Sequence, residues 1–452
     1  MKNNFKKISA VLVAGALMAP QAFAQTKSLE ERVSELEANQ SLNIFSFSGT
    51  FQTRWDDLIK LEQNSPATDN LGQSAVVDRK GESYMRMKFQ LEIDANVSKY
   101  IKFYSRLTAT KQFNSFYQQG YASTDVGGND LTAPSDYRSS AVFLEKAYVD
   151  LMIPDTNFTL SIGRLPTVDG QPENYKDGRA RMGTYPQLSY DSVLDGFALT
   201  YKADEYMPTD HKLAARVIYT PFSQYNVGTD GYVSGVTNQL GEKLNTQVDT
   251  TAAMIDYSND NKWGMDNFGL VLMYFQTGSL YYPNPAYTSG GAAGGASSLN
   301  LSVGGTTIAT EFNGIAHTGW DLSASYLLSN LKSHGSMYGM GFGTAAADDS
   351  MNGGVLLLST RYRLGSWILG AEYVNGSKDS FYYAANEEDL TSFYSTKGDA
   401  YHLYVTKKFT SNLSLRVGYM DQEYKWTPTG LGANKDSDRK IQTGYANMRL
   451  DF

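Results

Sequence analysis

The stretch from Tyr84 to Val97 alternates strictly between apolar and polar residues. The apolar positions are Met85, Met87, Phe89, Leu91, Ile93, Ala95 and Val97, and the polar positions between them are Arg86, Lys88, Gln90, Glu92, Asp94 and Asn96. Successive side chains of a β-strand point to opposite faces, whereas a helix repeats every 3.6 residues. The pattern therefore predicts a strand with one apolar and one polar surface.

The same two-faced pattern recurs along the chain and is also found at its C-terminal end. In the last eight residues, Ala446, Met448, Leu450 and Phe452 alternate with Tyr445, Asn447, Arg449 and Asp451. We expect about sixteen strands, at 43–55, 84–97, 100–110, 141–153, 157–164, 194–202, 211–221, 246–257, 267–278, 316–328, 334–343, 354–364, 367–375, 399–409, 413–424 and 440–452. The sequence therefore predicts an all-β chain.

The predicted connections alternate in length. Short ones fall at 98–99, 154–156, 329–330, 365–366 and 410–412, and long ones fall at 114–140, 165–193, 279–315 and 376–398. Short turns on one side and long loops on the other are typical of a transmembrane antiparallel β-barrel. A secreted β-sandwich is the alternative for a chain with 32 tyrosines, but it does not require this alternation. Because unpaired backbone groups are costly in hydrocarbon, we expect the barrel to close by pairing 43–55 with 440–452.

Residues 1–24 have the pattern of a secretory signal peptide, with three lysines, an apolar run and a small-x-small site before Gln25. Cleavage there leaves 36 basic residues (39 minus 3) against 47 acidic ones, so the net charge changes from −8 to −11. Nucleic acid is therefore not an expected partner. Cysteine is absent, which excludes disulfides, thiolate nucleophiles and cysteine metal sites.

Residues 25–42 change to a helical period before the predicted barrel at 43–452. Leu29, Val33 and Leu36 recur at heptad spacing, and Ser28 with Glu31 forms a capping box. An isolated helix of this length is unstable in water. We therefore predict a short α-helical coiled coil between copies, in a homotrimer; a frayed amphipathic tether is the alternative.

Several stretches resemble known outer-membrane proteins. The terminal strand ending in Phe452 resembles the strand that the barrel assembly machinery recognises in bacterial outer-membrane barrels. The segments 144–151, 161–170, 183–187 and 195–196 together resemble an uncharacterised family of porin-like outer-membrane proteins and, more loosely, phosphate-selective and other anion-type porins. This resemblance implies a barrel surrounded by outer-membrane lipid, without a known substrate.

Strand alternation also assigns residues to the lumen of the predicted barrel. We expect the pore to be lined by Arg54, Arg86, Lys88, Glu92, Asp94, Lys102, Arg106, Lys146, Arg216, Arg361, Arg363 and Arg416. The long connection after 157–164 is expected to narrow the pore with Asp169, Glu173, Lys176, Asp177, Arg179 and Arg181. A basic wall favours anions. The alternatives are that wall charges neutralise one another and that this loop is solvated outside.

The predicted function is an outer-membrane porin for passive diffusion of small hydrophilic solutes or ions, with an anion bias. The alternatives are a structural or adhesive barrel without conductance and a hydrophobic-compound transporter of the fatty-acid type. An outer-membrane hydrolase is least favoured, because the four histidines (His211, His317, His334 and His402) have no catalytic or metal-ligand spacing. We expect no enzyme activity, cofactor or metal.

Overall fold

The computed structural model describes residues 44–68, 74–112, 142–178, 181, 183–189, 191, 193–223, 247–260, 263–283, 298–333, 350–382, 389–426 and 436–452. The chain divides into two units, Met1–Phe45 and Ser46–Phe452, and the second is the barrel. The predicted signal peptide at 1–24 and coiled coil at 25–42 lie outside the described residues and stay predictions. Within the described part of the chain, no helix has the length and apolar character that a membrane crossing requires.

The described residues form strands and a few short helices. The strands are β1 (Phe45–Thr68), β2 (Ser74–Arg79), β3 (Glu82–Ser98), β4 (Ile101–Gln112), β5 (Val142–Met152), β6 (Phe158–Leu165), β7 (Leu194–Lys202), β8 (His211–Ser223), β9 (Gln247–Asp260), β10 (Asn267–Pro283), β11 (Ser298–Asn313), β12 (Trp320–Ser333), β13 (Ser350–Leu364), β14 (Trp367–Gly376), β15 (Gly398–Lys408), β16 (Leu413–Tyr424) and β17 (Lys440–Asp451). The helices are α3 (Glu173–Asp177), η1 (Asp204–Tyr206), η3 (Ile315–His317) and η4 (Phe393–Ser395).

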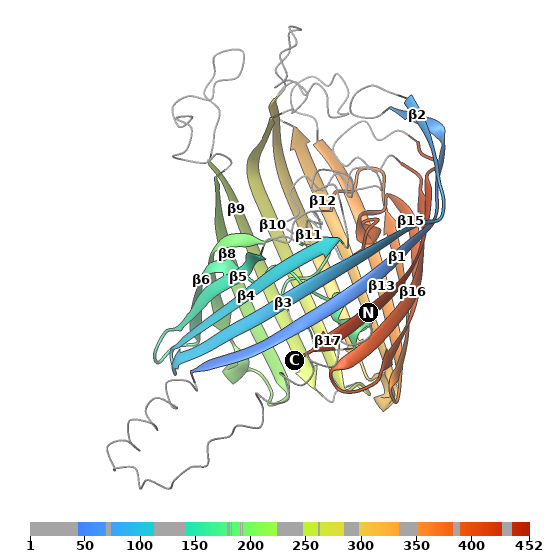
Figure 1. Ribbon diagram of the computed structural model, residues 1–452. Helices are drawn as coiled ribbons and strands as arrows, with labels where there is room; N and C mark the ends of the chain where they lie inside the picture. The colour runs from blue at the N-terminus through green and yellow to red at the C-terminus, as the bar shows by residue number, and fades with distance from the viewer. Residues whose placement is uncertain are drawn as a thin grey trace, which may run out of the picture. The chain divides into compact units, whose positions relative to one another are not determined.

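The strands close into one antiparallel barrel (Figure 1). β1 pairs with β17 from Thr50 opposite Asp451 to Glu62 opposite Lys440. β2 and β3 both pair with β1 and are separated by two residues only, so they are successive parts of one barrel strand. The seventeen described strand segments therefore make a sixteen-strand barrel, and the predicted closure of first strand on last is confirmed.

The two faces of the strands differ as the alternation predicts. On β17, Met448 is 42% exposed on the outer face, whereas Arg449 beside it points inward and is 4% exposed. Large apolar side chains such as Trp55, Val217 and Leu403 cover the outer surface of other strands. Because such a surface is stable against hydrocarbon and costly against water, the outer face suits a bilayer.

Two predicted boundaries are wrong. β11 occupies part of the predicted loop 279–315, and residues 329–330, predicted as a turn, lie inside β12. β11 carries Thr306, Ile308 and Thr310 outward but also Val303 and Ala309 inward, so its alternation is weak. The predicted strand 334–343 lies outside the described residues.

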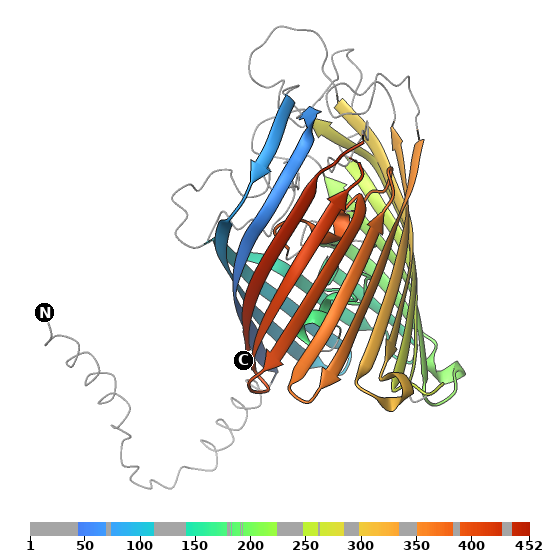
Figure 2. The same ribbon diagram turned by 90° about the vertical axis from the view of Figure 1, so that its right-hand side faces the viewer.

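Chain segments fill part of the barrel interior. The connection between β6 and β7 turns into the ring of strands, where Figure 2 shows its green segment behind the orange strands. Inward apolar residues of the wall, including Met273 and Leu357, form one buried cluster with Leu188 of this connection and with Tyr394 of the connection between β14 and β15. The cross-section of the lumen is therefore set by these inward segments as well as by the wall.

Candidate functional site in the barrel lumen

Residues 166–193, here called the inner loop, cross the barrel interior and carry helix α3. Most described residues of this loop are buried, Tyr175 and Leu188 completely. The hydroxyl group of Tyr175 donates to Asn313 Oδ1 at 2.9 Å and so reaches β11. The loop starts between β6 and β7, and α3 also contacts β13 and β15, which lie on the opposite side of the ring of strands.

Arg361 of β13 holds the backbone of α3. Its Nη1 donates to the carbonyl oxygens of Asn174 and Tyr175 at 3.3 and 3.2 Å, while its Nε donates to Asp321 Oδ2 at 2.6 Å. The guanidinium also lies 4.3 Å from the centre of the Tyr175 ring. One inward arginine thus fixes both the backbone and an aromatic side chain of the inner loop.

Asp177, the last residue of α3, is held by two further arginines. Arg416 Nη1 of β16 lies 2.7 Å from Asp177 Oδ1, and Arg449 Nη1 of β17 lies 2.8 Å from Asp177 Oδ2. All three side chains are less than a tenth exposed. Since charge-assisted hydrogen bonds are among the strongest that proteins make, this carboxylate is a firm attachment of α3 to the wall.

Neutral carbonyl groups at the end of α3 are also bound by the wall. Thr406 Oγ1 of β15 donates to the carbonyl oxygen of Lys176 at 3.0 Å. Lys408 Nζ donates to the carbonyl oxygen of Gly178 at 2.6 Å. The last carbonyl groups of a helix have no partner within it. Gly178, in the left-handed conformation, caps α3 through its backbone N–H to the carbonyl oxygens of Asn174 and Tyr175, and the wall binds the carbonyl groups that this cap leaves over.

The first part of the inner loop binds the near wall. Asp169 contacts Arg106 of β4, which is 3% exposed and also binds Glu92 and Glu145. Lys146 completes this group at 2.7 Å from Glu92. Glu145 and Lys146 both point inward, because the register between β4 and β5 shifts there. Strict alternation therefore missed Glu145; two adjacent charged residues within a strand were the available indication of a β-bulge.

The structure places the predicted pore-lining residues on the inner face, where many of them are paired. Arg54 Nε lies 2.8 Å from Asp56, and Arg86 Nη2 lies 2.6 Å from the same carboxyl group. Arg363 binds Asp321 at 3.0 Å. Arg216 donates to Thr200 Oγ1 and to Thr184 Oγ1, each at 2.8 Å. The remaining members of the predicted set are Lys88, Glu92, Asp94, Lys102, Arg106, Lys146, Arg361 and Arg416. Much of the inward basic charge is therefore engaged by the wall or by the inner loop.

The predicted charges of the inner loop contact partners as well. Asp169 and Asp177 bind wall arginines, and Arg181 lies 3.2 Å from Asp256 of β9. Glu173 and Lys176 pair with each other at 3.0 Å. Arg179 lies outside the described residues. The geometry thus shows charges that attach the loop to the wall. The sequence analysis predicted only that these charges narrow the pore, without partners for them in the wall.

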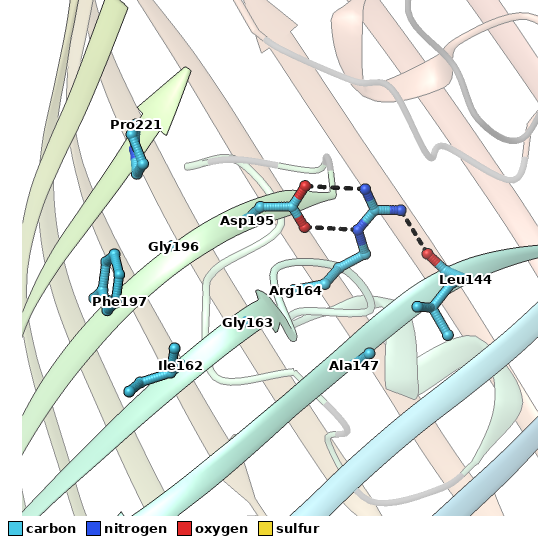
Figure 3. A pocket seen from close by; sticks show the side chains of 9 residues that line it. All are labelled: Leu144, Ala147, Ile162, Gly163, Arg164, Asp195, Gly196, Phe197 and Pro221. Carbon is cyan, nitrogen blue, oxygen red and sulfur yellow. Dashed lines mark hydrogen bonds and ion pairs between the residues drawn. The ribbon is translucent and has the colours of Figure 1, made fainter. Parts of the chain in front are cut away.

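An ion pair on the outer face marks the root of the inner loop (Figure 3). Arg164 at the end of β6 binds Asp195 of β7 through two hydrogen bonds, at 2.7 and 3.0 Å, and donates from Nη1 to the carbonyl oxygen of Leu144 at 2.7 Å. The pair borders a hollow of about 550 Å³ that Phe197 and Pro221 also line.

Two paired glycines explain how the strands can approach each other here. Gly163 has φ +127°, and a Cβ on it would lie 2.3 Å from the carbonyl oxygen of Ala147. A Cβ on its register partner Gly196 would lie 2.4 Å from the carbonyl oxygen of Tyr219. The Gly-Arg and Asp-Gly pairs of the sequence motif therefore meet in space, where the inner loop leaves the wall.

Exchanging the charges of Arg164 and Asp195 tests whether this ion pair stabilises the barrel where the inner loop begins. Asp195→Arg places two guanidinium groups side by side and should lower the stability of the barrel by about 1 kcal/mol, the scale of a partly exposed pair. The double variant Arg164→Asp with Asp195→Arg restores the pair but not the bond to Leu144, so it should recover part of the loss. The measurement is the temperature at which heat-modifiable gel mobility is lost. A double variant no more stable than the single one would contradict the assigned role.

The histidines do not form a recognisable catalytic group in the described residues. His402 is completely buried, with Nδ1 2.7 Å from Glu372 and Nε2 2.8 Å from the Tyr445 hydroxyl group. His317 pairs with Asp266, and His211 contacts the Tyr257 hydroxyl group. His334 lies outside the described residues, and within them no group of histidine and acidic residues has the arrangement of a metal site.

Comparisons with known proteins identify a family and one solved structure that supports the barrel fold. The family described as "Protein of unknown function (DUF3373)" matches residues 78–436, and no curated protein sequence matches the chain. The high-pH structure of Pseudomonas putida OprB is similar over 93% of this chain and 97% of that one, with 10% identity and a TM-score of 0.51. Salmonella typhi OmpF in complex with daunomycin is similar over 90% and 97%, with 11% identity and a TM-score of 0.45. At such identities the likeness concerns the barrel fold alone.

Proposed function

The chain belongs to the family of proteins of unknown function DUF3373, and from its barrel we propose that it is a passive channel of the bacterial outer membrane for small hydrophilic solutes. The observation that carries this proposal is the inner loop, which is bound across the interior of a closed sixteen-strand barrel by Arg361, Arg416 and Arg449. A rigid loop inside a barrel limits the size of a diffusing solute without any energy input.

The same architecture supports the location and the partners that we propose. An apolar outer face requires lipid around it, and the predicted signal peptide at 1–24 would direct the chain out of the cytoplasm. Phe452 closes the barrel, since its backbone nitrogen donates to the carbonyl oxygen of Gly49 at 3.0 Å. Its side chain is 54% exposed, and we propose that the strand ending in Phe452 is the one that the barrel assembly machinery recognises. A homotrimer joined by residues 25–42 completes the proposal.

Selectivity for anions should be modest. Arg54, Arg86 and Arg106 lie next to carboxylates, so they contribute little net field to the lumen. In water at about 0.15 M salt the Debye length is about 8 Å, which further weakens the remaining charges. We therefore propose a channel with a small anion bias that decreases as salt increases.

A hydrophobic-compound transporter is the second candidate, because some inward residues of β10 and β13, such as Val271 and Leu357, are apolar. Val271 and Leu357 are at most 1% exposed, however, so packing against other segments already covers them. They stabilise the interior, and these two side chains offer no exposed apolar surface to a ligand. A structural or adhesive barrel and a hydrolase differ from the proposed channel in a measurable way, since neither needs to conduct ions.

The test is the incorporation of purified, refolded protein into planar bilayers and proteoliposomes. We expect stepwise ionic current and osmotic swelling with small sugars that decreases as solute size increases. Heat-denatured protein from the same preparation is the control. Folded protein that gives neither current nor swelling would favour the structural barrel over the channel.

A further inference from the structure

Lys176 of α3 lies in a closed, charged environment. The side chain is 1% exposed, and its Nζ lies 3.0 Å from Glu173, 3.8 Å from Asp389 and 4.0 Å from Glu372. It also lies 5.0 Å from the centre of the Tyr394 ring. Burial opposes a charge here, but the three carboxylates raise the pKa of Lys176 well above its ordinary value. A buried ammonium group is stable only with such partners, so displacing any of them is costly.

Two of these partners belong to residues 389–397, here called the second inner segment, which precedes β15. This segment is bound to the wall independently of α3. Asp389 lies 2.7 Å from Arg54 of β1, and Gln422 of β16 donates from Nε2 to Thr396 Oγ1 at 2.8 Å and to the carbonyl oxygen of Thr391 at 3.1 Å. The wall therefore orients this segment, while Lys176 faces it from the lumen.

Tyr394 of the second inner segment contacts α3 through both its hydroxyl group and its ring. Its hydroxyl group lies 3.2 Å from Glu173 Oε2 of α3 and 3.2 Å from Glu372 Oε1 of β14. The ammonium group of Lys176 makes a cation–π contact with its ring. If either segment moved away, the almost completely buried charges of the other would lose their partners.

We propose that the inner loop and the second inner segment form one closing element of the lumen, linked by Lys176, so that release of either one releases the other. The effect on current rests on the proposed channel function. The structural coupling does not, because it concerns only the contacts between the two segments.

Amide hydrogen exchange of the full-length folded barrel tests the coupling. Lys176→Met keeps the apolar stem and removes the charge, and we expect about tenfold faster exchange in both 166–193 and 389–397. Lys408→Met is the matched control. It removes a lysine that binds the inner loop at Gly178 but leaves every contact of Lys176 in place, so any faster exchange should stay close to Gly178 and should not extend to 389–397. Faster exchange confined to the inner loop in Lys176→Met would overturn the proposal.

The reciprocal variant keeps the test decisive if Lys176→Met fails to fold. Asp389→Asn changes the second inner segment at its contacts with Arg54 and Lys176, and coupling requires it to accelerate exchange throughout residues 166–193 as well as in 389–397. Unchanged exchange of the inner loop in this variant would refute the link. Because exchange is read without current, a barrel that does not conduct would overturn the channel function and still leave this result standing.

Discussion

Asp177→Asn should release the end of α3 and raise the conductance of the channel severalfold. The change removes the one carboxylate that pairs with both Arg416 and Arg449. Deleting one partner of a buried ion pair costs about 3–5 kcal/mol, because the arginines lose a carboxylate in a buried place; Arg449 keeps Asp451 at 2.8 Å. Two guanidinium groups would then face the lumen, so anion preference should increase together with conductance. Single-channel current and the reversal potential in a tenfold KCl gradient measure both effects.

Two variants control for charge and size in this experiment. Asp155→Asn removes the same charge from an exposed turn and should leave current and selectivity unchanged. Asp177→Glu keeps the carboxylate, so its conductance should lie between that of the unmodified protein and that of Asp177→Asn. Equal conductance in Asp177→Asn and the unmodified protein would mean that Arg416 and Arg449 are not needed to hold the inner loop in its position in the lumen.

Arg106→Gln should have the largest effect on stability. Arg106 is the common partner of Glu92, Glu145 and Asp169, and it is 3% exposed. Its loss leaves three carboxylates close together, so we expect a cost of about 3–5 kcal/mol. The temperature of heat-modifiable mobility should fall, and the reversal potential should shift toward cation preference at low salt.

Lys102→Gln provides the matched control for Arg106→Gln. Lys102 points inward from the same strand but is only partly buried. Its replacement should change selectivity slightly and stability very little. If both variants were equally stable, Arg106 would not be the centre of the charged group, and the assigned contact with the inner loop would be wrong.

The strands could be predicted from the sequence because alternation is a local property. Met448 and Arg449 take opposite faces in the structure as their positions require, and closure of β1 on β17 follows from the cost of an open edge. β11 was missed for the same reason, since its inner face is largely apolar and gives no period of two. Prediction of the fold thus succeeded wherever the two faces differ in polarity.

The partners of the inward charges could not be predicted in this way. Arg449 and Asp177 are 272 residues apart in sequence, and no local pattern relates them. Alternation shows that Arg449 faces inward but does not show whether water or another chain segment lies opposite. The contribution of Asp389 to the site was missed for the same reason, because it lies in a connection without periodic pattern.

The measurement that tests the account most directly is the single-channel conductance of a barrel without its inner loop. Leu165 and Leu194 are register partners, so residues 166–193 can be replaced by an Asn-Gly turn that joins β6 to β7. We expect a folded barrel with severalfold higher conductance and weaker exclusion of large solutes. A folded variant with the conductance and size limit of the unmodified protein would contradict the claim that the inner loop controls passage through the lumen.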